Sequence, residues 1–174
     1  MRKRDNFRAA FDGFEPEIIA HYTEKDIQQC LNDAGIIRHR GKIEATIGNA
    51  QAFLNLRNAG QEFNDFCWRF VDGKPVINTF QTTQEIPTQN DVSRNLSKAL
   101  KQAGFKFCGP VIVYAFMQAV GMVNDHLVDC PHSATRHTLP ATRAPRVDVQ
   151  VTRHGTFKYM IIPEGELSKQ RGVV

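Results

Sequence analysis

The chain has 174 residues, of which 41% are hydrophobic and 23% are charged, so its composition is that of an ordinary globular protein and excludes disordered and fibrous chains. This length suits one domain with a tail or two very small domains. No apolar run reaches the eighteen residues of a membrane-spanning helix, and no apolar segment follows the basic N-terminus, so we expect neither a membrane protein nor a secretory signal. Four widely separated cysteines favour a reducing, cytoplasmic setting: Cys30, Cys67, Cys108 and Cys130.

The net charge of +4 comes from the C-terminal part of the chain. Residues 1–130 contain 15 Lys and Arg against 15 Asp and Glu, whereas residues 131–174 contain seven against three. Overall charge therefore gives no support to nucleic-acid binding by the first 130 residues, and only local basic clusters can do so.

The first 125 residues are predicted to form an all-α body of short helices. Thr23 followed three residues later by Asp26 resembles a capping box, and the apolar stripe after it stops at Gly35. The next helix is expected from Arg40 to Gly60, because apolar residues recur there at helical spacing.

Three further helices are predicted along the body. Residues 62–71 form a short aromatic helix, which the turn 72–75 closes, and a loop follows through Pro87. Apolar residues every four positions predict a helix over 92–104, and a strongly apolar stretch predicts another over 111–120.

The composition changes after Cys130. Prolines interrupt a polar, basic segment, and alternating apolar residues then predict a β-hairpin over 147–162 with its turn at 153–155. We therefore divide the chain into a helical domain of residues 1–130 and a basic, irregular tail of residues 131–174. A lone hairpin is marginally stable, so we expect it to dock on the helices or to be poorly ordered.

The segment 96–110 carries the clearest signal for binding. Two predicted helices are joined by a short turn between Gly104 and Gly109, and glycines allow positive φ and close approach of the main chain to a ligand. Amides at the start of the second helix form an anion site that suits a DNA phosphate. Three lysines would add salt-dependent attraction: Lys98, Lys101 and Lys106.

The same spacing also fits an ordinary pair of helices in which Phe105 and Phe107 pack inward. A second basic cluster, residues 38–42, stands at the start of a helix, where positive charge is unfavourable for the helix dipole. Most clusters of this kind are simply solvated, but the mismatch favours a purpose such as phosphate contact for its three cations: Arg38, Arg40 and Lys42.

Several segments, in the same order along the chain, carry a family resemblance. They are Asn6-Phe7-Arg8-Ala9, residues 33–43, Ala50, Phe53, Phe66, residues 68–71, residues 97–101, residues 104–107 with Gly109, residues 116–119 and residues 121–126. Together they resemble the type I DNA-3-methyladenine glycosylases of the helix-hairpin-helix DNA glycosylase superfamily, over residues 2–130.

The resemblance implies a base-excision repair enzyme that acts on alkylated double-stranded DNA. Such an enzyme flips 3-methyladenine out of the duplex and hydrolyses its N-glycosidic bond. Methylation at N3 leaves a positive charge on the base, so the leaving group is already activated and strong general-acid help is unnecessary. The resemblance assigns the hairpin Gly104–Gly109 to DNA and places Ala115 and Asn124 at the base pocket.

Asp125 is the candidate catalytic residue, because related glycosylases use an aspartate after the second hairpin helix to activate water. Its neighbour Asn124 and the nearby helix end are equally compatible with a capping role. Trp68 could stack on a flipped base, but its phenylalanine neighbours favour a place in the core.

The resemblance also implies a structural zinc ion. His126 and Cys130 match two of its four ligands, and their spacing predicts an imidazole and a thiolate one helical turn apart. Two ligands cannot close a tetrahedral site, and His132 and His137 are close enough in sequence to complete it.

The chain also departs from the family. Met1 aligns with an interior position of the family's domain, so we expect an N-terminally shortened chain without the recognition glutamate, the pocket aromatics and two zinc ligands. Ala115 stands where the family has a small hydroxyl residue, and nothing after Cys130 matches. If the start is misassigned, in-frame sequence upstream would restore the pocket.

These departures lead us to expect impaired excision, with a catalytically silent helix-hairpin-helix DNA-binding remnant as the alternative. We expect a cytoplasmic monomer. A missing first helix would expose the apolar side chains of Phe7, Phe11 and Phe14 and favour aggregation.

Overall fold

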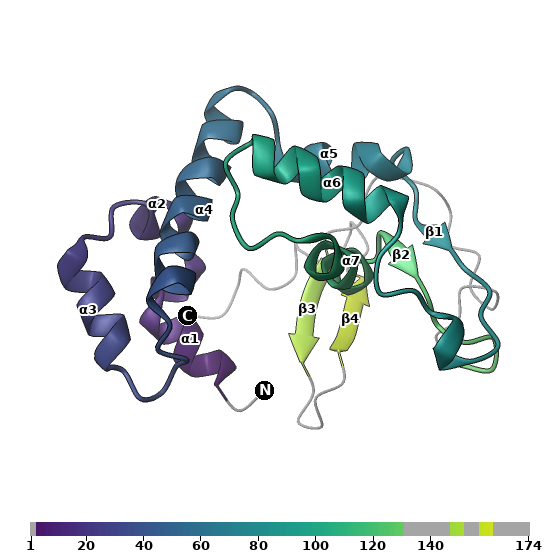
Figure 1. Cartoon of the computed structure of the whole chain (residues 1–174), viewed down its shortest axis with the longest axis horizontal. Coiled ribbons are helices and arrows are strands. Elements are labelled where there is room, and N and C mark those ends of the chain that lie inside the picture. Colours follow the sequence, from purple (N-terminus) through teal and green to yellow (C-terminus); the bar gives the residue numbers. More distant parts are fainter. Residues whose placement is uncertain (1–2, 131–146, 152–156, 162–174) are drawn as a thin grey trace, which may run out of the picture. The chain divides into compact units, whose positions relative to one another are not determined.

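The computed structural model describes residues 3–130, 147–151 and 157–161, and its chain forms two compact units (Figure 1). The first unit comprises Met1–Phe70 and Gln89–Val113, and the second comprises Val71–Thr88 and Tyr114–Val174. The helical elements in the described part of the chain are α1 (Arg4–Ala10), η1 (Asp12–Phe14), α2 (Pro16–Ile19), α3 (Glu24–Asn32), α4 (Arg40–Asn58), α5 (Phe63–Trp68), η2 (Arg69–Val71), η3 (Thr83–Glu85), α6 (Asp91–Gln102) and α7 (Pro110–Ala119). The predicted all-α body is confirmed.

Side-chain caps explain where the predicted helices begin. The main-chain N–H of Thr23 donates to the Asp26 carboxylate at 2.7 Å, so the predicted capping box starts α3. Asn90 and Ser93 exchange the equivalent pair of hydrogen bonds at the start of α6. At α4 the cap is His39, whose Nδ1 accepts from the Lys42 N–H at 3.2 Å.

The core of the first unit lies where α1, α2 and α3 gather around α4 (Figure 1). Its buried members are Phe11, Ile19, Cys30, Ile36, Ile43, Ile47 and Ala50. The prediction of an exposed Phe11 is therefore wrong: its side chain is 2% exposed, because its ring stacks between Phe7, Phe14 and Tyr22. Phe7 is half-buried, and Phe14 is 48% exposed as expected.

The aromatic helix α5 contributes to packing rather than to an open surface. Phe66 and Trp68 are buried, which confirms the core role of Trp68 over base stacking. Phe63 bridges Phe53 of α4 and Phe105, with ring centroids 5.8 and 5.5 Å away. This contact anchors the segment after α6 to the body of the first unit.

The second unit contains a short parallel ladder that was not predicted, and its first strand lies in a segment predicted as loop. β1 (Val76–Ile77) pairs with β2 (Val123–Asn124), and an isolated bridge joins Phe80 to Leu127 further along. Two-residue strands leave no alternating pattern in the sequence, so nothing local predicts them.

The predicted strands of the tail are confirmed as β3 (Val147–Val151) and β4 (Phe157–Ile161), which pair antiparallel with Val149 opposite Tyr159. The predicted turn at 153–155 and the proline-rich segment before β3 lie outside the described residues. No helix in the described part of the chain combines the length and the apolar character needed to cross a bilayer.

Candidate nucleic-acid interface

The segment between α6 and α7, residues 103–109, is called the hairpin below. Gly104 has φ +96°, in keeping with its predicted role, but the second left-handed residue is Phe107 at φ +55°, whereas Gly109 stays outside that region. Positive φ is unfavourable for a residue with a Cβ atom, so other contacts must hold Phe107 in place.

Two helices hold the hairpin on either side of Phe107. Asn49 of α4 binds both main-chain groups of Lys106: its Oδ1 accepts from the N–H at 2.8 Å and its Nδ2 donates to the carbonyl at 3.2 Å. The hydroxyl of Ser97, which is buried in α6, donates to the carbonyl of Cys108 at 2.6 Å. The hairpin is therefore preorganised by side chains distant in sequence.

These contacts also identify the main-chain amides that can meet a ligand. The N–H of Gly104 donates to the main-chain carbonyl of Lys101, and the N–H of Phe105 donates to that of Leu100. The N–H of Lys106 donates to Oδ1 of Asn49. Within the described residues the next three amides, at 107–109, have no acceptor on another residue. Three consecutive N–H groups ahead of a helix can bind an anion, so the candidate amides are those in the second half of the predicted 104–109 segment.

The structure brings the second basic cluster to the hairpin. The His39 ring meets the Phe107 ring edge-on, with centroids 6.4 Å apart, and Asn49 lies on the helix that His39 caps. Arg38 and Lys42, the sequence neighbours of His39, are exposed. The cluster 38–42 and the hairpin, which are more than sixty residues apart in sequence, are therefore in contact.

Arg40 differs from its neighbours, because its charge is already paired. Its guanidinium bonds Glu24 at 2.7 Å and Glu44 at 3.2 Å. The Arg40 hydrogen bond lowers the pKa of the Glu24 carboxyl to about 2. Arg40 is thus a poorer candidate for phosphate contact than Arg38 or Lys42.

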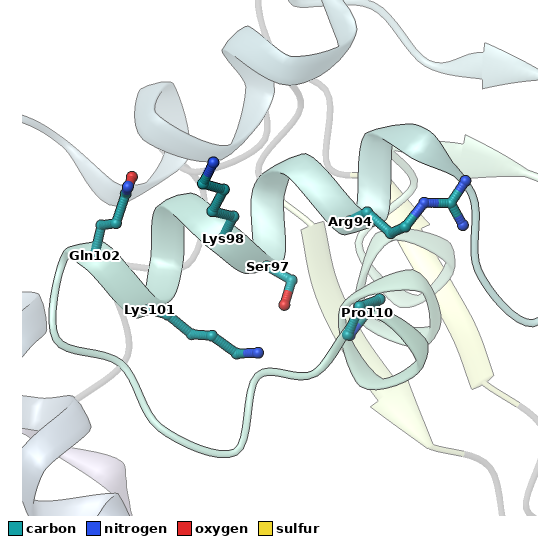
Figure 2. Close-up of a pocket in the computed structure, with 6 residues that line it drawn as sticks. All are labelled: Arg94, Ser97, Lys98, Lys101, Gln102 and Pro110. Carbon is teal, nitrogen blue, oxygen red and sulfur yellow. The ribbon is translucent and has the colours of Figure 1, made fainter.

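The exposed face of α6 forms a basic pocket of about 350 Å³ (Figure 2). It is lined by Arg94, Ser97, Lys98, Lys101, Gln102 and Pro110. In Figure 2 the Lys101 side chain extends along the hairpin side of α6 toward Pro110. Arg94 and Gln102 were not predicted, although they stand four residues before and after Lys98 and so share its helix face. Arg94 is partly neutralised by Asp91 at 2.6 Å.

In the second unit, Asp125 is the acceptor of a closed group of hydrogen bonds. Its carboxylate accepts from Asn78 Nδ2 at 2.7 Å, from Tyr114 Oη at 2.7 Å and from Gln118 Nε2 at 2.8 Å, and its side chain is 8% exposed. Burial, with the Asp125 hydrogen bond, raises the pKa of Tyr114. We call these four residues the Asp125 cluster. A carboxylate bound this way favours a structural role over water activation.

The other predicted residues of the second unit are dispersed over several elements. Asn124 lies at the end of β2, where its side chain accepts from the His126 N–H at 3.1 Å. This bond closes a local turn after a strand, so it is not the helix cap that the sequence offered as an alternative. Ala115 is exposed on α7.

His126 and Cys130 approach each other as predicted, but not across a helical turn. The segment is a bridge and turn, closed by the Cys130 N–H donating to Leu127 at 2.8 Å. Cys130 Sγ lies 3.5 Å from His126 Nδ1, and zinc bonds of ordinary length place two tetrahedral ligands about 3.5 Å apart. The pair therefore fits a zinc ion. The part of the chain that the structure describes has no group of three such donors, and His132 and His137 lie outside it.

Comparisons with known proteins agree on one family. Residues 1–133 match the family model described as methyladenine glycosylase. DNA-3-methyladenine glycosylase 1 of Escherichia coli (strain K12) is 52% identical over 130 residues, which cover 75% of this chain and 70% of that protein. The crystal structure of a 3-methyladenine DNA glycosylase I (TAG) superposes with a TM-score of 0.75 at 49% identity, over 76% of this chain and 72% of the other. The Staphylococcus aureus 3-methyladenine DNA glycosylase I, solved to explain 3-methyladenine recognition, gives 0.71 at 40% identity, over 74% and 69%.

Proposed function

Because the chain belongs to the methyladenine glycosylase family, we propose that it excises 3-methyladenine from alkylated double-stranded DNA by hydrolysing the N-glycosidic bond. The observation that carries this proposal is the match over residues 1–133. The preorganised hairpin supports it independently, because Asn49 and Ser97 fix a segment whose next amides have no acceptor on another residue and which carries the exposed Lys106.

The DNA contacts are divided between main chain and side chains. The amides at 107–109 take one phosphate, and Lys106 stands beside them. The exposed lysines of α6, Lys98 and Lys101, and the cluster around Arg38 and Lys42 attract the neighbouring backbone. None of these contacts reads sequence, which suits an enzyme that must find a damaged base in any context.

The chemical step asks little of the protein. A cationic 3-methyladenine is a good leaving group, so the pocket must unstack the base, hold it and admit water. We assign Ala115 and Asn124 to this pocket. Ala115 has no hydroxyl group, so Ala115→Ser adds a polar contact there and is expected to raise the rate of excision.

The test is release of free 3-methyladenine from methylated duplex DNA, measured by mass spectrometry against DNA in buffer alone. Excision above the buffer rate that falls with added salt supports the proposal. Salt-sensitive binding to duplex without base release contradicts it and favours the DNA-binding module instead. Loss of a lysine is tested with Lys106→Gln, and Lys74→Gln, which removes an exposed lysine that is not among the proposed contacts, is its control for net charge.

A structural zinc ion is a separate proposal. His126 and Cys130 would supply two of its ligands, and the bound ion would cross-link the turn after β2 without taking part in the chemistry. Zinc is quantified in protein that has been treated with chelator and dialysed against zinc, with His126→Ala and, as a control, Cys108→Ala. One zinc per chain that His126→Ala abolishes supports the proposal, and substoichiometric metal contradicts it.

We also propose that the protein acts as a monomer in the cytoplasm. The exposed Phe14 and Ile18 near the N-terminus are the apolar side chains through which it would aggregate. Light scattering at rising concentration tests this proposal.

A further inference from the structure

Phe107 combines two unfavourable features in one residue. Its backbone is left-handed, at φ +55°, and its ring is 57% exposed. Glycine at this position would adopt the same backbone without strain and would expose no apolar surface. An unfavourable choice of this kind, at a site with candidate ligand contacts, points to a use for the ring.

The surrounding contacts hold this conformation rather than relieve it. Asn49 binds both main-chain groups of Lys106, and Ser97 binds the carbonyl of Cys108, so the residues before and after Phe107 are both fixed. Phe105, two residues earlier, packs on Phe63. The hairpin thus directs one phenylalanine inward and the other outward.

The surroundings of the outward ring are cationic. The edge-on contact with His39 places it beside the cluster that contains Arg38 and Lys42, and Lys106 precedes it. The three amides without an acceptor begin at Phe107 itself. A phosphate bound by these amides would bring the adjoining deoxyribose against the ring.

Phe14 is a natural comparison within the same unit. It is also left-handed, at φ +67°, and 48% exposed, but its ring stacks on Phe11 with centroids 6.0 Å apart and an interplanar angle of 9°. Packing on the core therefore accounts for Phe14. The Phe107 ring meets the polar imidazole ring of His39, at an interplanar angle of 83°, instead of the core.

We propose that the Phe107 side chain is an apolar DNA contact that packs against a deoxyribose in the minor groove, next to the phosphate bound by the hairpin amides. This inference rests on the proposed DNA glycosylase function and adds a salt-independent contribution to its binding. Apolar side chains in the minor groove stabilise a bent, partly unstacked duplex, which is the form from which a base is flipped.

The experiment measures the Kd for a duplex carrying a non-hydrolysable abasic-site analogue at several salt concentrations, for the wild type, Phe107→Gly, Phe107→Leu and Lys106→Gln. We expect Phe107→Gly to raise Kd about tenfold at every salt concentration, because half a phenylalanine ring loses its burial. Phe107→Leu keeps most of the affinity. Lys106→Gln instead lowers the slope of log K against log salt by about 0.9.

The control variant is Phe14→Gly, which removes a ring of similar exposure from a residue that is also left-handed, and it is expected to leave Kd unchanged. Thermal unfolding separates binding from folding: relief of the left-handed strain should leave the Tm of Phe107→Gly equal to the wild type or higher. A Phe107→Gly variant that binds like the wild type overturns the inference. So does one that loses affinity only with a lowered Tm, or one that changes the salt slope.

Base release by the wild type is assayed with methylated DNA in parallel. Release by the wild type together with an unchanged Kd for Phe107→Gly overturns this inference and leaves the glycosylase function standing. Phe107-dependent binding without any base release overturns the glycosylase function and leaves the Phe107 contact with DNA standing.

Discussion

Side-chain hydrogen bonds have opposite consequences in the hairpin and in the Asp125 cluster. In the hairpin, Asn49 and Ser97 bind main-chain groups of exposed residues and leave three neighbouring amides for a ligand. In the Asp125 cluster, three side chains bind one buried carboxylate and leave its oxygens occupied. The comparison teaches how to judge a polar group near a functional segment. A group whose hydrogen bonds are all made within the protein has a structural role, whereas a surface group that still lacks a partner can bind a ligand.

Removing the Asp125 carboxylate should have the largest effect on stability. Asp125→Ala leaves the donors of Asn78, Tyr114 and Gln118 without their acceptor, and we expect the free energy of unfolding to fall by about 3 kcal/mol. Urea unfolding measures it, with Asp129→Ala, an exposed aspartate of the same unit, as the control. An Asp125→Ala protein of wild-type stability without base release would return Asp125 to the catalytic candidates.

Removing the Asn49 side chain should affect binding more than stability. Asn49→Ala is expected to cost about 1 kcal/mol of unfolding free energy, as two exposed hydrogen bonds are lost. Because the hairpin is then less preorganised, DNA affinity should fall about tenfold. The matched control is Asn55→Ala, an exposed asparagine on the same helix. Equal affinity in the two variants would mean that the hairpin needs no fixing.

Tyr114 gives the Asp125 cluster a dependence on alkaline pH. Its pKa is raised in the folded state by burial and by Asp125, so its contribution to stability is complete below the unfolded pKa of about 10 and is lost as the pH rises above that value. Tyr114→Phe should lower stability by about 1 kcal/mol at neutral pH and flatten the loss above pH 10. Unfolding in urea at pH 7 and pH 10.5 measures both, with Tyr22→Phe as the comparison, since the pKa of Tyr22 is also raised. A loss of stability above pH 10 that Tyr114→Phe leaves unchanged would assign it to other groups.

Glu24 gives the smallest expected effect, on the interface side of the comparison. Its pKa is lowered from 4.5 to about 2 by Arg40 first and Gln28 second, so its contribution is present above pH 4.5 and is lost as the pH falls toward 2. Glu24→Gln should remove this part of the acid dependence of unfolding. The substitution also removes one of the two carboxylate partners of Arg40, so it should raise DNA affinity slightly at low salt. A DNA titration at neutral pH measures this change. Unchanged affinity would mean that Arg40 lies away from the bound DNA.

Local sequence patterns predicted much of the fold. The capping box at Thr23, the helix over 40–60 and the two helices around the hairpin follow from periodicity and end signals, and all are confirmed. The β1–β2 ladder could not be predicted, because two residues give no period and their partners lie 47 positions away. The exposure of Phe11 was predicted wrongly, because the prediction assumed that a missing first helix would leave its side chain uncovered. Phe11 instead belongs to the core of the first unit.

For the candidate interface, the residue types were predictable and their availability was not. Lys98, Lys101 and Lys106 are exposed as expected. Arg40 carries the same charge but faces Glu24, which lies sixteen residues earlier in the chain. An ion pair across that separation leaves no trace in local spacing.

By itself, the sequence determined the five helices α3 to α7, the positions of the cations and the family to which the chain belongs, since these properties depend on neighbours within a few residues or on an ordered set of motifs. Only the tertiary structure decided that Phe107 faces outward, that Asn49 fixes Lys106 and that Asp125 is enclosed by three donors. The reason is physical: a side chain's exposure and its unfilled hydrogen bonds depend on atoms brought close by packing. In this chain those atoms come from as far as 68 residues away, as in the contact between His39 and Phe107.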